Sequence, residues 1–490
     1  MDQIHQTKWG CPVDVFVDPN DPRPLTAQLY EQLRDAIVEG RLAPDDRLAP
    51  TRTLAADLGV SRSTVTEVYG RLVAEGYIEG RSGRGSIVAA ITPPPILPRP
   101  TSAVLAPTAR AAAVARYDSR PAGEATFDLR PGSVDLSLFS SSDWRRCMLK
   151  ALASVAAQYG DPAGTTELRC ALARWVTRSR GVAATADEVV VTSGSGHAID
   201  LVARVLLNPG DVVAVEEPGY PPVTEQLRSH GLTVMGVPVD HHGIVVDAIP
   251  RRARMIYVTP SHQYPLGVVM ARHRRHELLR WASRNNAAVI EDDYDSEFRH
   301  STRPLEPLQR LDRDGRVIYV GTFSKTLSPA LRLGFLVAPR TLIPAICAIR
   351  QAIDWCPPTV TQTALCSFIE QGHLDRHLRR SRLIYRERHR LLWEALELLP
   401  TGYRRLPARA GLHLAIVGVD VPDDDRLLAV TAAHKLLVGS LRYCYQVTDP
   451  VPGFLVGFGA LPSSHVLAAC QTLRSALLQA QHPRVDDGQD

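Results

Sequence analysis

Lysine is scarce in this sequence of 490 residues, although lysine and arginine together number 56. The lysines are Lys8, Lys150, Lys325 and Lys435. Chemistry that needs an amine nucleophile therefore has few places to occur in this chain.

Apolar runs and paired cysteines are missing as well. No uncharged run approaches the ~18 residues that cross a bilayer, and residues 1–16 lack the apolar core of a signal peptide. The 8 cysteines form no CxxC pair and have no histidine partner at metal-ligand spacing. We therefore expect a cytoplasmic protein with reduced thiols and no structural metal.

The composition is that of a globular chain, with 45% hydrophobic and 22% charged residues. Its length is typical of several domains. The net charge of +4 is too small for this length to indicate a partner.

The first ninety residues predict three helices. Apolar residues recur every four positions through LTAQLYEQLRDAIVEGRL, which predicts an amphipathic helix that ends near Gly40. A second helix, TRTLAADL, follows Pro50 and ends at Gly59. Ser61 is a suitable N-cap for the third, SRSTVTEVYGRLVAEG.

This arrangement is typical of a DNA-binding helix-turn-helix, because a tight glycine turn precedes a helix that starts with arginine and hydroxyl groups. The stretch YIEGRSGRGSIVAA predicts two short strands around a Gly/Arg tip, which is a wing. Helix count alone leaves a protein-interaction module open as an alternative. The residues expected to contact DNA are Arg52, Ser61, Arg62, Ser63, Thr64, Thr66, Arg81 and Arg84.

The composition then divides the rest of the chain. Residues 91–125 are rich in proline and alanine and predict a linker. We predict a winged helix-turn-helix domain over 15–90, a large domain over 126–482 with a small α+β subdomain from about 375 to 482, and a polar tail over 483–490.

The large region alternates short apolar runs with helical stretches. EVVVT, VVAVEE, MIYVT, AVIED, VIYV and FLVAP predict buried strands, so the fold class is α/β, a mainly parallel sheet with helices on both faces. In such sheets ligands bind at the carboxyl ends of the strands.

Polar residues follow these strands at that edge. Lys325 follows VIYV, Asp292 and Tyr294 follow AVIE, Tyr220 follows VVAVEE, and a Gly/Ser turn with Ser195 follows EVVVT. Each residue alone is more often structural: a surface lysine, a helix cap or a packed aromatic. Together with Arg332 they match the needs of pyridoxal phosphate, whose aldehyde requires an amine, its ring nitrogen an anion, and its phosphate amides and an arginine.

The motifs GTFSKTLSPALRLGF, EDDYDSEF, PSHQYPLGV, EEPGYP and YGDPAGTTELR resemble the fold-type-I aminotransferase module of MocR/GabR-type regulators, in which a GntR-superfamily winged helix precedes that module. The resemblance implies that Lys325 is the Schiff-base lysine, with Asp292 on the pyridine nitrogen and Tyr294 on the ring hydroxyl. Tyr220 would stack on the ring. The phosphate would be held by Ser195, Gly196, Thr322 and Arg332.

The resemblance has further implications outside this group. Tyr159 is similar to a tyrosine that one subunit lends to its neighbour's phosphate site, which implies a homodimer. Arg442 is the candidate for binding an effector carboxylate. The sequence departs from the family at His197, where glutamine is common, and at Pro222, where GABA-sensing members carry arginine.

The leading hypothesis is a transcriptional regulator that binds repeated promoter half-sites and senses pyridoxal phosphate, an amine or an amino acid through an internal or external aldimine at Lys325. A working aminotransferase that carries a DNA-binding domain is the alternative. A structural DNA-bridging protein with an inactive cofactor pocket is a third class.

Overall fold

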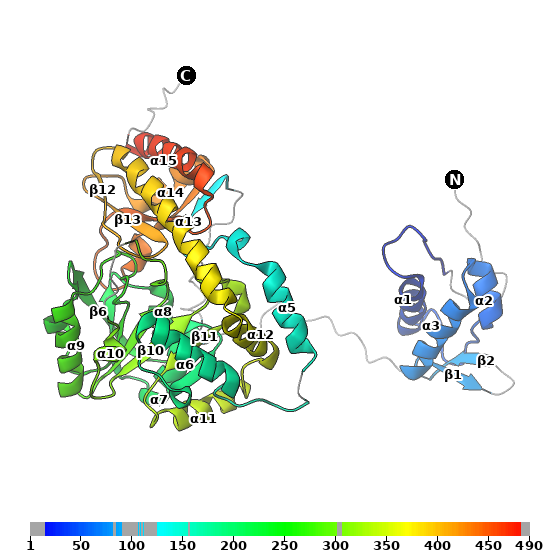
Figure 1. The fold of residues 1–490 in the computed structure, drawn as a ribbon. Helices are drawn as coiled ribbons and strands as arrows, with labels where there is room; N and C mark the ends of the chain where they lie inside the picture. The colour runs from blue at the N-terminus through cyan, green and yellow to red at the C-terminus, as the bar shows by residue number, and fades with distance from the viewer. Residues whose placement is uncertain are drawn as a thin grey trace, which may run out of the picture. The chain divides into compact units, whose positions relative to one another are not determined.

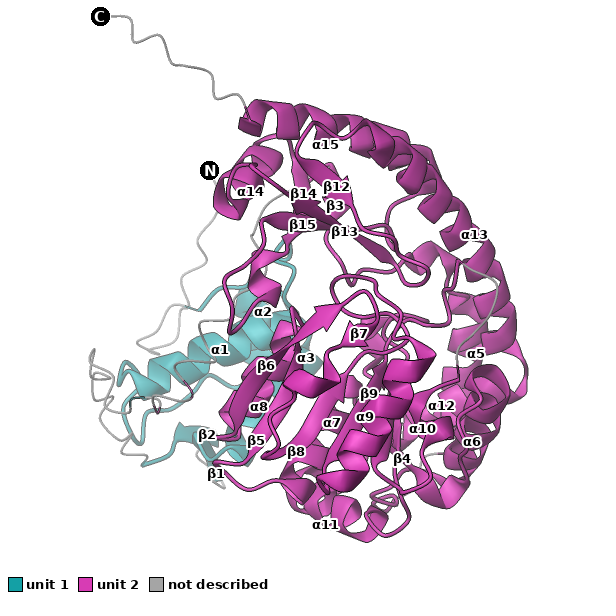
Figure 2. Cartoon of the chain, turned by 90° about the vertical axis from the view of Figure 1, so that its left-hand side faces the viewer, with its two compact units in different colours: residues 1–106 teal, residues 107–490 magenta. Residues whose placement is uncertain are grey.

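A computed structural model describes residues 15–81, 85–90, 106, 108, 111, 125–154, 157–300 and 306–481. The chain divides into two compact units, residues 1–106 and 107–490, which Figure 2 shows in different colours. Most of the predicted linker and the tail after Gln481 lie outside the described residues.

The first unit is a three-helix core with a two-stranded wing, as predicted. Leu29, Leu33, Val65 and Leu72 from the first and third helices are at most 2% exposed and form its centre. The elements are α1 (Leu25–Val38), α2 (Thr51–Leu58), α3 (Arg62–Ala74), and the antiparallel pair β1 (Ile78–Arg81) and β2 (Gly85–Val88).

The turn between α2 and α3 has the predicted chemistry. Gly59 adopts φ 65°, a left-handed conformation that favours glycine and ends α2. The Ser61 hydroxyl accepts the Thr64 backbone N–H at 3.1 Å and caps α3. These local interactions fix where α3 begins.

The second unit is built on an eight-stranded sheet in the order β4-β11-β10-β9-β8-β5-β6-β7. The five central strands from β10 to β6 are parallel, whereas β11 is antiparallel to β4 and β10, and β7 to β6. The strands are β4 (Val189–Thr192), β5 (Val212–Glu217), β6 (Thr233–Asp240), β7 (Gly243–Ile244), β8 (Ala253–Val258), β9 (Ala288–Asp293), β10 (Val317–Thr322) and β11 (Gly334–Val337).

Helices cover both faces of this sheet, because its strands are apolar on both sides. Side chains of α7, α8 and α11 pack on one face and those of α9 and α10 on the other. The bounds are α5 (Ser141–Leu152), α6 (Thr166–Arg180), α7 (Ser195–Leu206), α8 (Pro221–Ser229), α9 (Arg272–Arg284), α10 (Leu308–Leu311), α11 (Ile343–Asp354), α12 (Thr359–Glu370) and α13 (His373–Ala395). Within the described residues, no helix has the length and apolarity to cross a membrane.

Strand β10 runs two residues further than its sequence suggested. The apolar run was expected to break at Gly321, yet Gly321 and Thr322 still pair with Phe335 and Gly334 of β11. A Cβ at Gly321 would lie 2.5 Å from the Phe335 ring. The glycine is therefore a site of close packing inside the strand rather than its end.

A second sheet, in the order β12-β13-β15-β14-β3, forms the C-terminal part of this unit. Its first strand in the chain, β3 (Phe127–Leu129), pairs in parallel with β14 (Leu436–Ser440). The other strands are β12 (Tyr403–Arg405), β13 (His413–Gly418) and β15 (Gly453–Gly457), with helices α14 (Asp424–Ala433) and α15 (Val466–Gln481). The sequence did not predict β3. The residues that follow β3 contact the turn after β10.

Candidate functional site

Lys325 lies in the turn that follows β10, at the carboxyl edge of the main sheet. Its Nζ donates a hydrogen bond to the Gly132 carbonyl at 2.8 Å. Gly132 has φ 103°, and a Cβ there would lie 3.1 Å from the amine. The segment after β3 therefore packs directly against Lys325.

Two neighbouring acids on β9 have opposite environments, because successive strand residues face opposite sides of the sheet. Asp292 accepts a hydrogen bond from the Tyr257 hydroxyl at 2.7 Å through Oδ2, while its buried Oδ1 has no hydrogen-bond partner. Burial raises the pKa of Asp292 to about 7. Burial also acts on Asp293, but the charge of Arg180 helps to bring the pKa of that carboxyl below its usual range. Each of the two acids keeps a buried Oδ1 without a hydrogen-bond partner, but only Asp293 of the pair has an ion-pair partner, Arg180.

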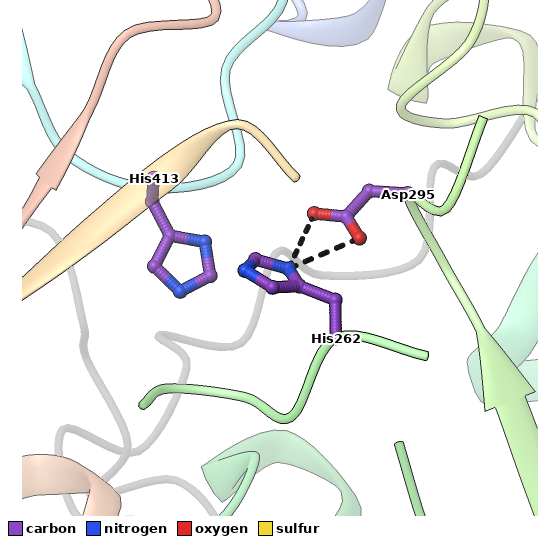
Figure 3. A group of neighbouring side chains, drawn as sticks. All are labelled: His262, Asp295 and His413. Carbon is purple, nitrogen blue, oxygen red and sulfur yellow. Dashed lines mark hydrogen bonds and ion pairs between the residues drawn. The ribbon is translucent and has the colours of Figure 1, made fainter. Parts of the chain in front are cut away.

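Tyr294 belongs to a buried polar cluster that the sequence did not reveal. Its hydroxyl lies 2.9 Å from His262 Nδ1, and Asp295 lies 3.1 Å from the same nitrogen. His413 places its ring centroid 4.9 Å from that of His262, and Figure 3 shows the two rings beside Asp295. Burial lowers the pKa of His413 to about 3, so this ring is neutral at pH 7.

His262, Asp295 and His413 offer ligand atoms within 4.8 Å of one another, a set that could hold a metal ion. They come from the loop after β8, the loop after β9 and strand β13, so no sequence spacing connects them. His262 falls in the quoted motif PSHQYPLGV directly after a predicted strand, which was the one available signal. Its Nε2 is buried without a hydrogen-bond partner.

Tyr220 stands at the same edge, immediately before α8. It is 37% exposed, and its ring meets Tyr264 edge-on at a centroid distance of 5.3 Å. Tyr264 in turn lies 6.2 Å from the Tyr294 ring. The aromatic groups therefore connect Tyr220 with the buried cluster.

The N-terminus of α7 supplies a site for an anion. Ser195 and Gly196 occupy its first turn, and the N-cap Gly194 has φ 104°. A Cβ at Gly194 would lie 3.1 Å from the Arg332 guanidinium, so this cation lies against the helix end. Free N–H groups, the helix dipole and a guanidinium together suit a phosphate.

Two predicted residues near this turn have mainly local contacts. Thr322 Oγ1 accepts the Ser324 backbone N–H at 3.2 Å and shapes the turn before Lys325. His197 accepts the Ser193 backbone N–H at 3.2 Å through Nδ1, and burial lowers its pKa. The neutral His197 ring thus caps the start of α7.

Two other predicted residues have their interactions elsewhere. Tyr159 is 75% exposed and stacks on Trp355, itself 52% exposed, at a centroid distance of 4.8 Å. The Arg442 side chain is 52% exposed and lies 3.4 Å from Asp425. Neither of these interactions involves the group around Lys325.

Several of the predicted DNA-contacting residues are exposed on the first unit. Arg52 lies on α2, and Arg62, Ser63 and Thr66 lie on α3, all with exposed side chains. Within the part of the chain that the structure describes, Arg52 and Arg62 form no ion pair. Arg81 ends β1, but its side chain and the whole of Arg84 lie outside that part.

Comparison with known proteins separates the same two regions. Residues 135–448 match the aminotransferase class I and II family, and residues 25–88 match the bacterial regulatory proteins of the gntR family. A probable rhizopine catabolism regulatory protein, MocR, of Rhizobium meliloti is 34% identical over 95% of this chain and 96% of its own. The pyridoxine biosynthesis transcriptional regulator PdxR of Corynebacterium glutamicum is 32% identical, over 91% and 94%.

A solved structure shares the fold of the second unit. Kynurenine aminotransferase of Pyrococcus horikoshii superposes with a TM-score of 0.68 and 27% identity over 73% of this chain and 91% of that protein. Its fold family implies pyridoxal phosphate as the cofactor.

The residues present fit this cofactor. An amine stands at Lys325, the unpartnered Asp292 Oδ1 suits a protonated ring nitrogen, and the α7 terminus with Arg332 suits the phosphate. The N-terminal unit is of the DNA-binding GntR type. This chain therefore belongs to the MocR family of pyridoxal-phosphate-dependent transcriptional regulators, in which a GntR-type helix-turn-helix is joined to an aminotransferase-like domain.

Proposed function

We propose that the aminotransferase-like domain is a sensor, and that pyridoxal phosphate, an amine or an amino acid bound at Lys325 changes the affinity of the winged helix for promoter DNA. The supporting observation is that an amine, an unmatched buried carboxylate and an anion-binding helix end share one sheet edge in a chain with a GntR-type domain. A ligand changes DNA affinity only if it binds two domain arrangements differently.

Each site residue has a proposed role in this sensor. When bound, pyridoxal phosphate supplies an aldehyde that condenses with amines. Lys325 provides the amine, and Asp292 holds a proton on the ring nitrogen. Tyr294, oriented by its contact with His262, donates to the ring hydroxyl.

The remaining contacts position the cofactor. Tyr220 stacks on one ring face, which its exposed ring and edge-on contact with Tyr264 support. The phosphate is bound by Ser195, Gly196, Thr322 and Arg332.

The working unit is proposed to be a homodimer. Two large stacked aromatic rings, Tyr159 and Trp355, are exposed on this chain, and apolar surface of this kind is commonly covered in an assembly. Tyr159 would then reach the phosphate site of the neighbouring subunit. Sedimentation should give a dimer for the wild type, and Trp355→Ser should shift the mass towards the monomer.

Arg442 is proposed to bind an effector carboxylate. Its half-exposed guanidinium is only loosely paired with Asp425, at 3.4 Å, so a stronger anion could replace that partner. Arg442→Ala should raise the concentration of amino acid needed for a spectral response, whereas the response to a simple amine should not change. Equal responses of wild type and variant to amino acids would remove Arg442 from the site.

The domain limits are proposed as predicted: a winged helix over 15–90, a linker over 91–125, the cofactor domain over 126–482 with its small subdomain over about 375–482, and a tail over 483–490. The end of β2 at Val88 and the start of β3 at Phe127 support the inner limits.

A second candidate function is residual transamination. The likeness to a kynurenine aminotransferase favours it, as do the amine of Lys325, the buried carboxylate of Asp292 and Arg332 at the α7 terminus. Steady conversion of amino acids by the purified protein, above a Lys325→Ala blank, would establish turnover. A signal equal to that blank would exclude it.

DNA binding measured with and without pyridoxal phosphate tests the sensor proposal directly. The wild type should bind DNA with different affinities in the presence and absence of pyridoxal phosphate. Lys325→Ala should bind DNA with the same affinity in both conditions. Lys150→Ala, an exposed lysine on α5, is the matched control and should behave as wild type. Equal affinities in every combination would refute the sensor.

A further inference from the structure

Helix α9 carries arginines of two kinds. Arg275 is 1% exposed and donates to the carbonyls of Met270 and Pro260, and Arg274 forms an ion pair with Asp240 at 2.9 Å. These two arginines stabilise the fold. The others lie on a different flank of the helix and have no such role.

Exposed basic residues recur every four positions along that flank: Arg272, His276, Arg280 and Arg284. We call these four residues the basic row. Because residues four apart lie above one another on a helix, the row forms one continuous strip. At about 1.5 Å per residue, the strip is ~18 Å long.

The basic row forms one wall of a groove of about 630 Å³. Residues 310–314, from the end of α10 into the loop before β10, form the other wall and add Arg310 and Arg313. Figure 1 shows α9 beside α10 at the outside of this unit. Cations therefore line both sides of the groove.

The acids of the groove do not neutralise these cations. The Asp312 carboxylate accepts backbone N–H groups of Asp314, Arg316 and Val317 at 2.6–3.0 Å. Asp314 is the other acid in the lining. The lining thus combines five arginines with two acids, one of which is already used by the backbone.

Among the described residues, none of the five lining arginines forms an ion pair or hydrogen bond through its side chain. Some exposed arginines elsewhere in the same unit do: Arg174 pairs with Glu370 and Arg178 with Asp375, both at 2.6 Å. Several like charges within a Debye length of ~10 Å repel one another and do not stabilise the fold. The cluster is better explained by an anionic partner.

We propose that this groove binds the phosphate backbone of promoter DNA that flanks the site bound by the winged helix. A strip of ~18 Å spans about five phosphates of one strand at ~3.4 Å each, which a small anion would not need. By their number alone, residues 91–125 can reach up to ~115 Å at about 3.3 Å per residue, so both units can contact one DNA molecule. The inference rests on DNA binding by the GntR-type domain.

The test uses the full-length protein and two promoter fragments that share one footprinted operator. The short fragment contains the operator alone, and the long fragment adds about two helical turns of DNA on each side. Arg280→Glu combined with Arg284→Glu removes half of the basic row. Arg379→Glu combined with Arg380→Glu, two exposed arginines on α13, is the control with the same change in charge.

We expect wild type and the α13 control to bind the long fragment more tightly than the short one. The groove variant should lose this advantage, with affinity for the long fragment lower by about 10-fold and affinity for the short fragment unchanged. Neutral replacements, Arg280→Gln with Arg284→Gln, should reduce the slope of log K against log salt by about 2, because each lost phosphate contact contributes ~0.9.

Several results would overturn the proposal. The first is that the groove variant binds the long fragment as tightly as wild type does. The second is that the α13 control loses as much affinity for the long fragment as the groove variant does. The third is that the groove variant loses as much affinity for the short fragment as for the long one. Calorimetry with pyrophosphate provides another test. If wild type binds pyrophosphate tightly, and the groove variant loses this binding but keeps its affinity for DNA, the groove is a site for a small anion.

An unchanged visible absorbance of the groove variant with pyridoxal phosphate shows that its cofactor domain is folded. The response of DNA affinity to the cofactor is measured separately on the short fragment. A failure of the sensor proposal is therefore distinguishable from a failure of the groove proposal.

Discussion

The winged helix and the sheet edge around Lys325 use polar groups in opposite ways. On α3, the proposed DNA contacts Arg62, Ser63 and Thr66 are exposed within one short segment. At the sheet edge, Asp292 is 3% exposed, and Lys325 contacts Gly132, 193 residues earlier in the chain. The first surface is assembled by one helix, and the second only by the complete fold.

The two regions also differ in the free-energy cost of an ionised side chain. Burial raises the pKa of Glu216, Glu291 and Asp292 to about 7, so burial disfavours the ionised form of these three acids in the cofactor domain. The exposed α3 surface carries no such penalty. A protonated ring nitrogen beside Asp292 would therefore favour the ionised form of this carboxylate.

The largest effect is expected at the amine. Lys325→Ala should abolish the visible absorbance of protein mixed with pyridoxal phosphate, because no other described lysine lies at the sheet edge. Absorption spectra after gel filtration measure this, with Lys150→Ala as the control. If the visible absorbance of pyridoxal phosphate eluted with the Lys325→Ala protein, Lys325 would not be the amine that binds the cofactor. The contrast between the two regions would then not hold.

Asp292→Asn should change the pH dependence of stability. The folded-state pKa of about 7 exceeds the ordinary 3.8, so the folded apo protein holds a proton that the unfolded chain releases, and its free energy of unfolding falls as pH rises from about 4 to 7. The variant lacks this loss and should be more stable than wild type by up to about 4 kcal/mol at pH 8, with little difference at pH 4.

Urea unfolding of the apo protein at several pH values measures this difference. Asp293→Asn is the control with the opposite sign, because the folded-state pKa of Asp293 is lowered and Arg180 would lose its partner. That variant should be less stable at neutral pH. Parallel pH profiles for wild type and Asp292→Asn would contradict the raised pKa.

Arg62→Ala should weaken specific DNA binding by about 1–3 kcal/mol, because an unpaired arginine in the first turn of α3 can bond a guanine edge. Fluorescence anisotropy with a footprinted operator and a scrambled sequence measures this. Arg41→Ala, whose side chain pairs with Glu39, is the control. An unchanged affinity for the operator would exclude α3 from the major groove.

The smallest effect is expected at the helix cap. Ser61→Ala removes the acceptor for the Thr64 N–H and should destabilise the start of α3 by about 1 kcal/mol. Faster hydrogen exchange at the Thr64 and Val65 amides of the full-length protein measures this local loss. Ser61→Asp, which retains an acceptor, should restore protection, and equal exchange rates in Ser61→Ala and wild type would contradict the cap.

Much of the fold was predictable because it depends on local patterns. Apolar spacing gave α1 and α3, Gly59 and Ser61 gave the turn between the helices, and the buried runs gave six strands of the main sheet. Strand β3 was not predictable, since three residues after a proline-rich stretch carry no periodicity. Its pairing with β14 depends on a partner some 300 residues away.

The candidate site was predictable only in part. Strand ends placed Lys325, Asp292 and Tyr220 at one edge, because parallel strands end together. Nothing local indicated that His262, Asp295 and His413 would meet, or that arginines of α9 would face the 310–314 turn. These contacts join segments that are distant in the chain.

Asp292 and Asp293 show which properties of the site follow from the sequence and which depend on the tertiary structure. The sequence alone determined that two acids stand at the end of an apolar run, and its resemblance to a fold family implied an amine near them. Only the tertiary structure decided that Asp293 pairs with Arg180 while Asp292 accepts a hydrogen bond from the Tyr257 hydroxyl. The physical reason is that composition and periodicity fix which side of a strand a residue occupies, whereas its charge state depends on groups that other segments bring to it.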